Sequence, residues 1–427
     1  MRSLRFLGIG CVVGVMILAA SFDGQERPIT IHVGTLLDGK GGMQRNTAVV
    51  VQGSKILKLD PSAANPTYEL GTLTMLPGMI DVHVHINGHF GKDGRADNRE
   101  ETAAQQAYYT AENAYATLMA GFTTVQSVGA QTDVDLREAI ARGTIPGPRI
   151  LTSIQQINEN SGGPDKLRQI VRGLKAEHAD VVKIFASKSI REGGGQTMTD
   201  DQLVAVCGEA KTQGIRTMVH AHAAEAIKAA VRAGCGQIEH GVFVDEEALK
   251  MMADRGIYFD PNIGLVLQNY LRNKPKFLGI GNYTEEGFAY MQKAIGLNVA
   301  MFKKALATPG LQMPMGTDAV AGAHGRNADE IIARVEGGQK PMDAIISATS
   351  LAAKSLNMGS TIGSISPGME ADIIAIEGDP LADISALTRV TLRYERRKGL
   401  QKHEVKGSKQ GANISLVADL NRGAGNS

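Results

Sequence analysis

Apolar and polar positions along the chain follow two different periods, and the change between them divides the sequence into three parts. Residues 27–76 alternate apolar and polar side chains, with Gly and Asp at the turns, which predicts a small β unit. A similar β pattern returns at residues 359–404. Between these parts, from 77 to 358, short apolar runs alternate with amphipathic stretches typical of helices. The pattern therefore predicts a β unit split around a central α/β domain.

The central part consists of repeated strand-then-helix units. The run ADVVKIFAS precedes the helical DDQLVAVCGEAKTQG, and IRTMVHAH precedes AEAIKAAVRAG. Such units imply a parallel sheet, and the length of this part suits a (β/α)8 TIM barrel. A doubly wound open sheet is the alternative, although no GxGxxG fingerprint follows the first strand of the series. We expect the two terminal β pieces to pair into one small composite β-sandwich.

Two local features complete the prediction of structure. Asn327 and Glu330 have the spacing of a capping box at the start of a late helix, ADEIIARVEGG. The tail at 405–427 has little core-forming pattern, so we expect it to be mobile.

The N-terminal segment has the pattern of a targeting sequence. Residues 1–21 join a cationic start, MRSLR, to the apolar run FLGIGCVVGVMILAA, and polar residues follow. This arrangement is typical of a cleaved bacterial secretory signal, with cleavage near Ala20 or Ser21. It predicts a periplasmic or secreted protein without stable membrane association after cleavage. An uncleaved N-terminal anchor is the alternative.

Composition narrows the class of protein. Hydrophobic residues make up 43% of the chain and charged residues 21%, as in ordinary globular proteins, and the formal net charge is +1. No long basic or acidic run is present, so nothing in the sequence indicates binding to nucleic acid. Outside the predicted signal, only Cys207 and Cys235 remain, without metal-binding spacing. We expect two buried free thiols, with a single disulfide after export as the alternative.

Side chains that bind metals occur at the ends of five predicted strands. In IDVHVHI, His83 and His85 point to one face of a strand, together with Asp81, because side chains alternate along a strand. Enzymes built on parallel barrels place their chemistry at the carboxyl ends of the strands. The strand-end residues that fit this rule are His83, His85, Lys183, His220, His222, His240 and Asp318. Their joint occurrence predicts a metal site.

Each of these residues also has an ordinary structural explanation. Two histidines on one strand can be solvated or hydrogen-bonded in the core, and Lys183 can extend its amine to the surface. His240 can belong to a capped turn, and Asp318 can cap the segment that follows it. The recurrence of ligand-type groups on successive strands, rather than any one of them, favours the metal site.

The same motifs give the chain a resemblance to a known family. LPGMIDVHVH, VVKIFAS, HAH followed by IEHG, MGTDA and SISPGMEADIIAIEGDPL resemble the amidohydrolase superfamily of metal-dependent (β/α)8-barrel hydrolases. More narrowly, they are similar to its imidazolonepropionase-related, prolidase-like branch, which includes Xaa-Pro dipeptidases and ochratoxin-cleaving amidases. Relatives in this branch often form homo-oligomers. The resemblance covers nearly all of the chain after the predicted signal.

The resemblance implies a role for each strand-end residue. His83, His85 and Asp318 would bind one divalent ion, and His220 and His240 would bind a second. Lys183, carboxylated by carbon dioxide, would be shared by both ions. These are the ligand types that zinc accepts, although manganese or cobalt could substitute. By the same resemblance, His222 would polarise the substrate carbonyl.

The implied reaction is hydrolysis of a C–N bond by metal-activated water, with Asp318 accepting the proton. For substrate binding the sequence suggests Arg191, on the glycine-rich loop SKSIREGGGQTM, as the partner of a substrate carboxylate. Tyr270 and His324 are further candidates to line the pocket. Related dipeptidases commonly have a tyrosine in the loop that follows the lysine, whereas this chain has none between Lys183 and Thr199.

The sequence therefore predicts an exported enzyme that holds two metal ions and cleaves dipeptides or N-acyl amino acids with a free carboxylate. One alternative is a lactonase, phosphotriesterase or cyclic-amide hydrolase that uses the same metal site on a neutral substrate. A second alternative is a non-catalytic binding protein. That class usually loses ligand residues, whereas all six ligand positions are present here.

Overall fold

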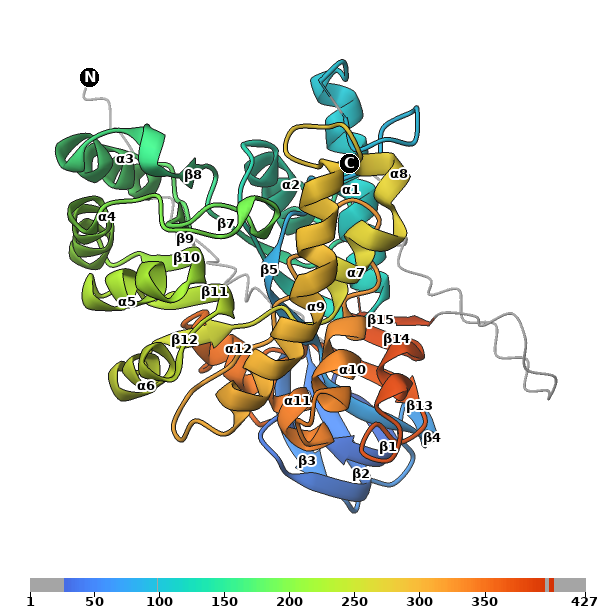
Figure 1. Ribbon diagram of the computed structural model, residues 1–427. Helices are drawn as coiled ribbons and strands as arrows, with labels where there is room; N and C mark the ends of the chain where they lie inside the picture. Colours follow the sequence, from blue (N-terminus) through green and yellow to red (C-terminus); the bar gives the residue numbers. More distant parts are fainter. Residues whose placement is uncertain (1–26, 98, 396–398, 403–427) are drawn as a thin grey trace, which may run out of the picture.

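The computed structural model describes residues 27–97, 99–395 and 399–402 (Figure 1). The predicted secretory signal at 1–21 and the predicted mobile tail at 405–427 lie outside these residues. Among the helices that are described, none combines the length and the apolar character needed to cross a membrane.

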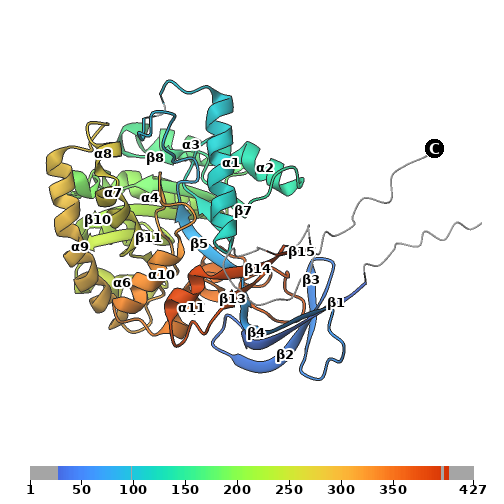
Figure 2. The same cartoon turned by 90° about the vertical axis from the view of Figure 1, so that its right-hand side faces the viewer.

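Strands from the two ends of the chain join in one seven-stranded sheet, in which β13 lies antiparallel to β4. Figure 2 shows these early and late strands side by side below the central domain. Along the sheet the order is β15-β14-β13-β4-β1-β2-β3, so the predicted pairing of the terminal segments is present. The strands are β1 (Ile29–Leu37), β2 (Met43–Gln52), β3 (Lys55–Asp60), β4 (Tyr68–Pro77), β13 (Ile373–Glu377), β14 (Val390–Glu395) and β15 (Gly399–Lys402).

The central part is α/β, with two parallel sheets. One sheet has the order β5-β6-β7 and the other β12-β11-β10-β9-β8. Their strands are β5 (Met79–Val84), β6 (Phe122–Ser127), β7 (Arg149–Thr152), β8 (Gln156–Ile157), β9 (Val181–Phe185), β10 (Arg216–Ala223), β11 (Gln237–Phe243) and β12 (Tyr258–Asp260). Regular strand pairing thus gives two sheets, and single parallel bridges join the segment 312–319 to β12 and β5.

The predicted strand that ends at Asp318 covers LQMPMGTD, and the structure shows no regular strand there. Residues 312–319 form only the isolated bridges Tyr258–Gln312 and Val84–Ala319. Pro314 has no N–H to donate to a neighbouring strand. The carbonyl oxygens of Met313 and Pro314 accept hydrogen bonds from the Arg334 guanidinium at 3.2 and 3.0 Å. This segment is therefore held by a side chain in addition to its strand neighbours.

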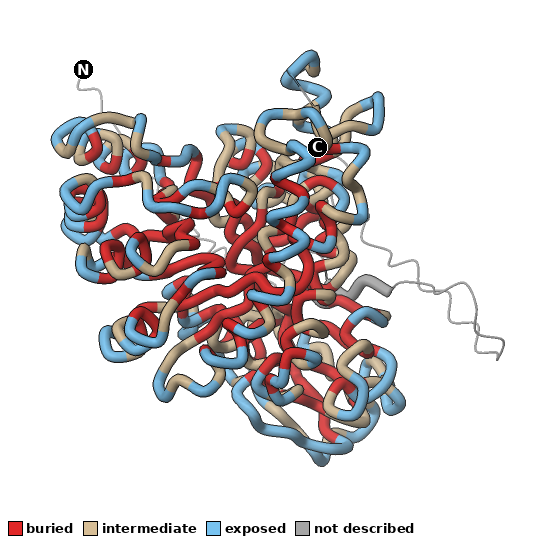
Figure 3. The backbone as a smooth tube through the Cα atoms, viewed as in Figure 1, coloured by how far each residue is buried: buried red, intermediate tan, exposed pale blue. Residues whose placement is uncertain are grey.

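Helices follow most of the central strands and bury one face against them, as Figure 1 and the red buried core of Figure 3 show. Helix α6, for example, begins after Asp245, whose carboxylate accepts from the Ala248 N–H, and ends at Gly256 in a left-handed conformation. The helices are α1 (Ala103–Met119), α2 (Thr132–Ala141), α3 (Pro164–Ala176), α4 (Asp200–Thr212), α5 (Ala224–Arg232), α6 (Glu246–Arg255), α7 (Leu265–Arg272), α8 (Lys274–Phe277), α9 (Glu285–Leu306), α10 (Ala328–Glu336), α11 (Pro341–Ser347) and α12 (Ser350–Ser355). Short 3-10 turns are η1 (Glu159–Ser161), η2 (Ile190–Glu192) and η3 (Ile384–Thr388).

The predicted capping box of α10 is absent, because both side chains have other buried partners. Asn327 makes no side-chain cap. Its amide donates to Asp81 Oδ2 at 2.7 Å. The Glu330 carboxylate accepts the backbone N–H groups of Ile263, Gly264 and Leu265 at 2.7–3.0 Å. Glu330 therefore caps the start of α7 rather than that of its own helix.

The expectation of two free thiols is wrong. Cys207, in α4, and Cys235, in the turn before β11, form a disulfide, with their Cα atoms 5.1 Å apart. Both residues are buried, as predicted, but the sequence pattern does not show that the α4–β10–α5–β11 path returns the second cysteine to the first. The disulfide closes a loop and so reduces the number of conformations open to the unfolded chain, which stabilises the fold.

Candidate metal centre

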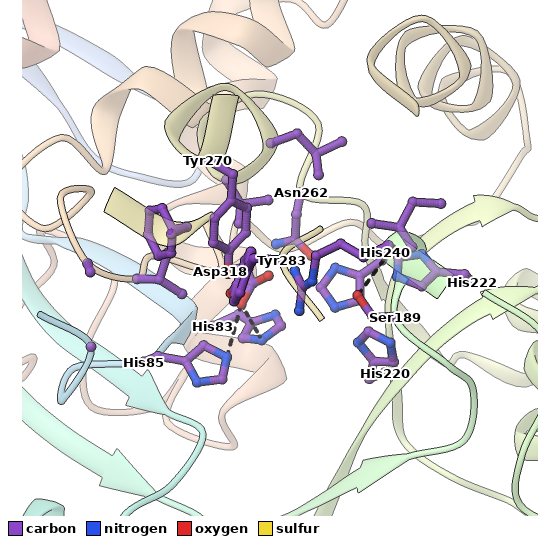
Figure 4. Close-up of a pocket in the computed structure, with 18 of the residues that line it drawn as sticks. His83, His85, Ser189, His220, His222, His240, Asn262, Tyr270, Tyr283 and Asp318 are labelled. Atoms are coloured by element: carbon purple, nitrogen blue, oxygen red, sulfur yellow. Dashed lines mark hydrogen bonds and ion pairs between the residues drawn. The ribbon is translucent and has the colours of Figure 1, made fainter. Parts of the chain in front are cut away.

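The strand-end side chains converge on one cavity of about 360 Å³. His83 comes from β5, Lys183 from β9, His220 and His222 from β10, and His240 from β11. His85 follows β5 directly, and Asp318 lies in the 312–319 segment. Figure 4 shows the imidazoles and the Asp318 carboxylate facing the same space. All seven predicted residues line the cavity.

Asp318 is in contact with both histidines of the IDVHVHI motif. Its Oδ1 lies 3.1 Å from His85 Nε2 and 3.3 Å from His83 Nε2. On another side of His83, Lys183 Nζ lies 3.3 Å from the same Nε2 atom. These four side chains therefore place two imidazole nitrogens, a carboxylate and an amine within one small volume.

The other three histidines form an adjoining group. The ring centroid of His220 lies 4.6 Å from that of His240 and 4.7 Å from that of His222. His240 also lies 5.3 Å from His83, ring centroid to ring centroid, so it joins the two groups. His222 Nδ1 is buried and has no hydrogen-bond partner among the described residues.

The backbone is unusual at two of these positions. His240 has a φ of 70° and Asp318 a φ of 54°, both in the left-handed region that residues other than Gly rarely adopt. The turn at Asp318 is anchored on β5: the Asp318 N–H donates to the His83 carbonyl oxygen at 2.7 Å. Thr317 donates through its N–H and its hydroxyl to Asp81, at 3.0 and 2.6 Å. Such strained conformations persist only where the surrounding structure imposes them, and they occur often at functional sites.

Burial controls the charge of these groups. It lowers the pKa of Lys183, which favours the neutral amine. Burial also lowers the pKa values of His220 and His240 well below the ordinary value, and lowers the pKa of His222 to about 3. Burial alone would raise the pKa of Asp318, but the neighbouring His83, His85 and Lys183 hold it below the ordinary value. His83 differs, because burial and Lys183 act to lower its pKa but Asp318 and Glu239 outweigh them and raise it to about 9. The cavity thus offers neutral imidazoles at His220, His222 and His240 and a carboxylate at Asp318, the forms that coordinate metals.

The donor set fits a divalent cation. Donor atoms of His83, His240 and Asp318 all lie within 4.8 Å of one another. Imidazole and carboxylate together are ligands that zinc and related ions prefer. A second group, His83 with Glu239 and Asp260, is equally close. Protein donors already engage Asp260 and one oxygen of Glu239. Asp260, for instance, accepts from Arg334 at 2.9 Å and from the Gly316 N–H at 2.9 Å.

Two of the three predicted substrate residues, Arg191 and Tyr270, line the same cavity. The Arg191 guanidinium lies 4.1 Å from the ring centroid of Tyr283 and 5.4 Å from that of Tyr270. Its Nε donates to Asn282 Oδ1 at 2.9 Å. Tyr283, which comes from the turn before α9, was not predicted, because no motif or spacing in the sequence connects it with Arg191.

His324 has a different position from the one predicted. It is not among the described side chains that line this cavity. Its ring lies beside the backbone of His85 and Gly88, and burial lowers its pKa to about 4. His89 lines the cavity instead, with its Nε2 at 2.7 Å from Glu101 Oε2 and its ring stacked on Tyr109.

Comparison with known proteins agrees with this geometry. Residues 74–395 match the Amidohydrolase family. The chain belongs to the amidohydrolase family. The match includes the strands and turns that carry all of the cavity residues described above, so the family resemblance predicted from the motifs is confirmed.

Individual relatives of this amidohydrolase cover most of its length. Ochratoxinase of Aspergillus niger is 25% identical over 418 residues, which span 86% of this chain and 85% of the relative. A solved Xaa-Pro dipeptidase with methionine in its active site is 31% identical, with a TM-score of 0.80, over 88% of this chain and 100% of that one. A solved prolidase complexed with N-methylphosphonate-L-proline is 25% identical, with a TM-score of 0.79, over the same shares of the two chains.

These relationships place the protein among enzymes. The amidohydrolase is a metal-dependent hydrolase that acts on C–N bonds, as the family match and its prolidase and ochratoxinase relatives indicate. The cluster of candidate metal-binding residues in the cavity is consistent with this class. The branch suggested by the sequence motifs is therefore confirmed as well.

Proposed function

We propose that this amidohydrolase cleaves the C–N bond of dipeptides or N-acyl amino acids that have a free carboxylate. The observation that carries the proposal is the position of Arg191, whose guanidinium lines the same cavity as the candidate metal ligands. Within the described residues no carboxylate forms an ion pair with it, so its terminal nitrogens are available to a substrate. An arginine in this state binds a carboxylate through two parallel hydrogen bonds.

The relatives support the same class of substrate. One relative is a Xaa-Pro dipeptidase solved with bound methionine, and another is a prolidase complexed with N-methylphosphonate-L-proline. Both bound molecules are amino acids or amino-acid derivatives. The loop after Lys183 lacks the tyrosine that related dipeptidases commonly have there. Tyr270 and Tyr283, whose rings lie near the Arg191 guanidinium, would position the substrate carboxylate instead.

For the metal centre we propose two divalent ions, most favourably zinc. His83, His85 and Asp318 would hold one ion and His220 and His240 the other, with Lys183, carboxylated by carbon dioxide, as the shared ligand. Complete burial of Lys183 and its lowered pKa support carboxylation, because only the neutral amine reacts with carbon dioxide. When bound, such ions activate water and polarise the scissile carbonyl.

The protein's own groups then handle the proton and the substrate. Asp318, whose lowered pKa keeps it ionised, would accept the proton of the attacking water and pass it to the leaving nitrogen. His222 lines the cavity beside His240 and would hydrogen-bond the substrate carbonyl oxygen. Arg191 would hold the carboxylate and so orient the amide toward Asp318.

We further infer that the two parallel sheets are parts of one (β/α)8 barrel. The Asp180 N–H, at the start of β9, donates to the Thr152 carbonyl oxygen of β7 at 2.8 Å. Across the other gap, the segment 312–319 bridges to Tyr258 of β12 and to Val84 of β5. These contacts support a closed ring in which 312–319 takes the eighth strand position. The terminal sheet would fold over itself as the predicted composite β-sandwich.

Export and assembly also belong to this proposal. The signal-like segment 1–21 supports a periplasmic or secreted enzyme. Mass spectrometry of the mature protein isolated from its native compartment would show whether this segment has been removed. A homo-oligomer is the further expectation, and light scattering of the purified enzyme tests that expectation.

The deciding experiment compares hydrolysis of N-acyl amino acids and Xaa-Pro dipeptides with hydrolysis of their C-terminal amides. We expect free acids to be cleaved faster by the zinc-loaded enzyme, and Arg191→Ala to reduce kcat/KM for them by roughly 10–100-fold, the value of a hydrogen bond to a charged group. Arg172→Ala, which removes a surface arginine, is the matched control. If lactones or ring amides are cleaved faster, and Arg191→Ala leaves them unchanged, the neutral-substrate alternative replaces this proposal.

A further inference from the structure

One side of the His83 ring faces a buried carboxylate that lies outside the proposed set of metal ligands. His83 Nδ1 lies 2.8 Å from Glu239 Oε2, and both side chains are almost completely inaccessible to solvent. The opposite ring atom, Nε2, lies 3.3 Å from Asp318 Oδ1 and from Lys183 Nζ. The ring therefore lies between a buried carboxylate on one side and the candidate metal centre on the other.

We infer that Glu239 is a positioning residue, which sets the orientation and the tautomer of His83 and so determines how strongly the centre holds metal. A His83 ring that binds metal is neutral, and because a carboxylate only accepts hydrogen bonds, such a ring beside Glu239 carries its hydrogen on Nδ1. The lone pair is then on Nε2, the atom that faces Asp318 and Lys183. A carboxylate partner also makes the imidazole a better ligand.

Glu239 is itself held for this contact. Its Oε1 accepts from Gln237 Nε2 at 2.8 Å, which leaves Oε2 for His83. The nearby Asp260 lies farther from the ring, with its Oδ2 3.8 Å from His83 Nδ1. Asp260 accepts from Arg334 at 2.9 Å and from Asn262 at 2.8 Å. Arg334, completely buried, thus balances part of the negative charge next to the site.

The left-handed backbone at His240 explains how one strand supplies two groups. Adjacent residues on a regular strand point to opposite faces. With a φ of 70° at His240, β11 departs from this rule, and the consecutive Glu239 and His240 both lie near His83. Glu239 meets its Nδ1, and the His240 ring centroid lies 5.3 Å from that of His83.

This inference rests on the proposed metal centre, and Glu239→Gln tests it without any substrate. In Glu239→Gln, the amide oxygen would take the Oε1 position, because Gln237 donates a hydrogen bond there. The amide NH2 would then face His83 Nδ1 and favour the tautomer that carries its hydrogen on Nε2. The matched control is Glu330→Gln, which alters another completely buried carboxylate near Arg334, one that caps the start of α7. Metal-free forms of each protein are titrated with Zn²⁺ against a chromogenic chelator, and their thermal unfolding is compared.

We expect Glu239→Gln to weaken one of the two zinc equivalents by about 10–100-fold and to leave the other unchanged. Glu330→Gln lowers thermal stability but keeps both affinities. Equal zinc affinities in Glu239→Gln and the wild type would overturn the inference. If the wild type itself binds no zinc, the proposed metal centre fails, and this inference with it.

A measurement on the wild type covers the case in which Glu239→Gln does not fold. In ¹⁵N-histidine-labelled, zinc-loaded enzyme, long-range proton–nitrogen spectra distinguish the two tautomers, and the His83 signal is assigned by its loss in His83→Asn. A hydrogen on Nδ1 of His83 supports the positioning role. A hydrogen on Nε2 refutes it.

Discussion

Lys183 and His83 meet in the interior: the amine Nζ of the first lies 3.3 Å from Nε2 of the second. An ammonium next to a metal-ligating imidazole would repel the ion, whereas a carbamate on the same nitrogen would bind it. We therefore predict that Lys183→Ala contains less bound metal than the wild type. Its kcat should fall by at least about 100-fold, since polarisation of the substrate by metal contributes several kcal/mol to catalysis. Metal analysis and kcat measurement test this.

A short carboxylate such as acetate or propionate should partly restore both metal content and activity to Lys183→Ala, because it can occupy the place of the carbamate. Lys188→Ala, five residues further on and exposed, is the control and should behave as the wild type. Full metal content in Lys183→Ala without added carboxylate would show that this lysine is not a ligand.

The placement of Lys183 was predictable, and the reason is general. Its strand is otherwise a continuous apolar run, and carboxyl ends of parallel strands lie together, so residues at those ends meet whatever their distance in sequence. His83, His220 and Asp318 were predicted by the same rule, and they line one cavity. The rule needs only strand periodicity and strand order.

The features that escaped prediction depend on contacts between distant segments. The positive φ at His240 has no local sequence signal, since a histidine within a strand pattern predicts extended backbone. Glu330 matches a capping box locally, yet it binds the backbone at 263–265. Likewise Tyr283 reaches Arg191 only because α9 packs on the η2 turn. In each case a tertiary contact overrides a local pattern.

Tyr283 gives a second prediction, about substrate orientation. Its ring lies 4.1 Å from the Arg191 guanidinium carbon, a stacking contact worth about 0.5–2 kcal/mol. Tyr283→Leu keeps apolar bulk but removes the aromatic face, so we expect kcat/KM for free-acid substrates to fall by roughly 3–30-fold. Rates on the C-terminal amides should stay close to those of the wild type. Tyr290→Leu, on the exposed side of α9, is the matched control, and an equal loss on acids and amides would contradict the orienting role.

The Cys207–Cys235 disulfide should contribute measurably to stability. It links residues separated by 28 positions, and a loop of this size corresponds to about 2–4 kcal/mol of unfolding free energy. The double variant Cys207→Ser/Cys235→Ser should therefore unfold at lower urea concentration than the oxidised wild type. Adding dithiothreitol should move the wild-type midpoint to that of the variant. A wild-type urea midpoint that does not change when dithiothreitol is added would indicate that the two cysteines are not disulfide-bonded in solution.

His324 gives a prediction about acid sensitivity. Burial lowers the pKa of its ring to about 4, whereas the unfolded chain keeps an ordinary value near 6.5. Between these values the unfolded state binds a proton that the folded state does not, so folding stability decreases as the pH falls from about 6.5 to 4. The contribution lost over this range is up to about 3 kcal/mol.

His324→Gln should flatten this part of the pH profile, because glutamine cannot take up the proton. His220, His222 and His240 have lowered pKa values and act in the same direction, so the wild-type slope exceeds that of a single group. The informative quantity is therefore the difference between the two profiles, measured by urea unfolding at several pH values. His178→Asn, which removes an exposed imidazole, is the matched control. If His324→Gln and the wild type lose stability in parallel from pH 6.5 to 4, the ring at 324 is not held in its neutral form by burial.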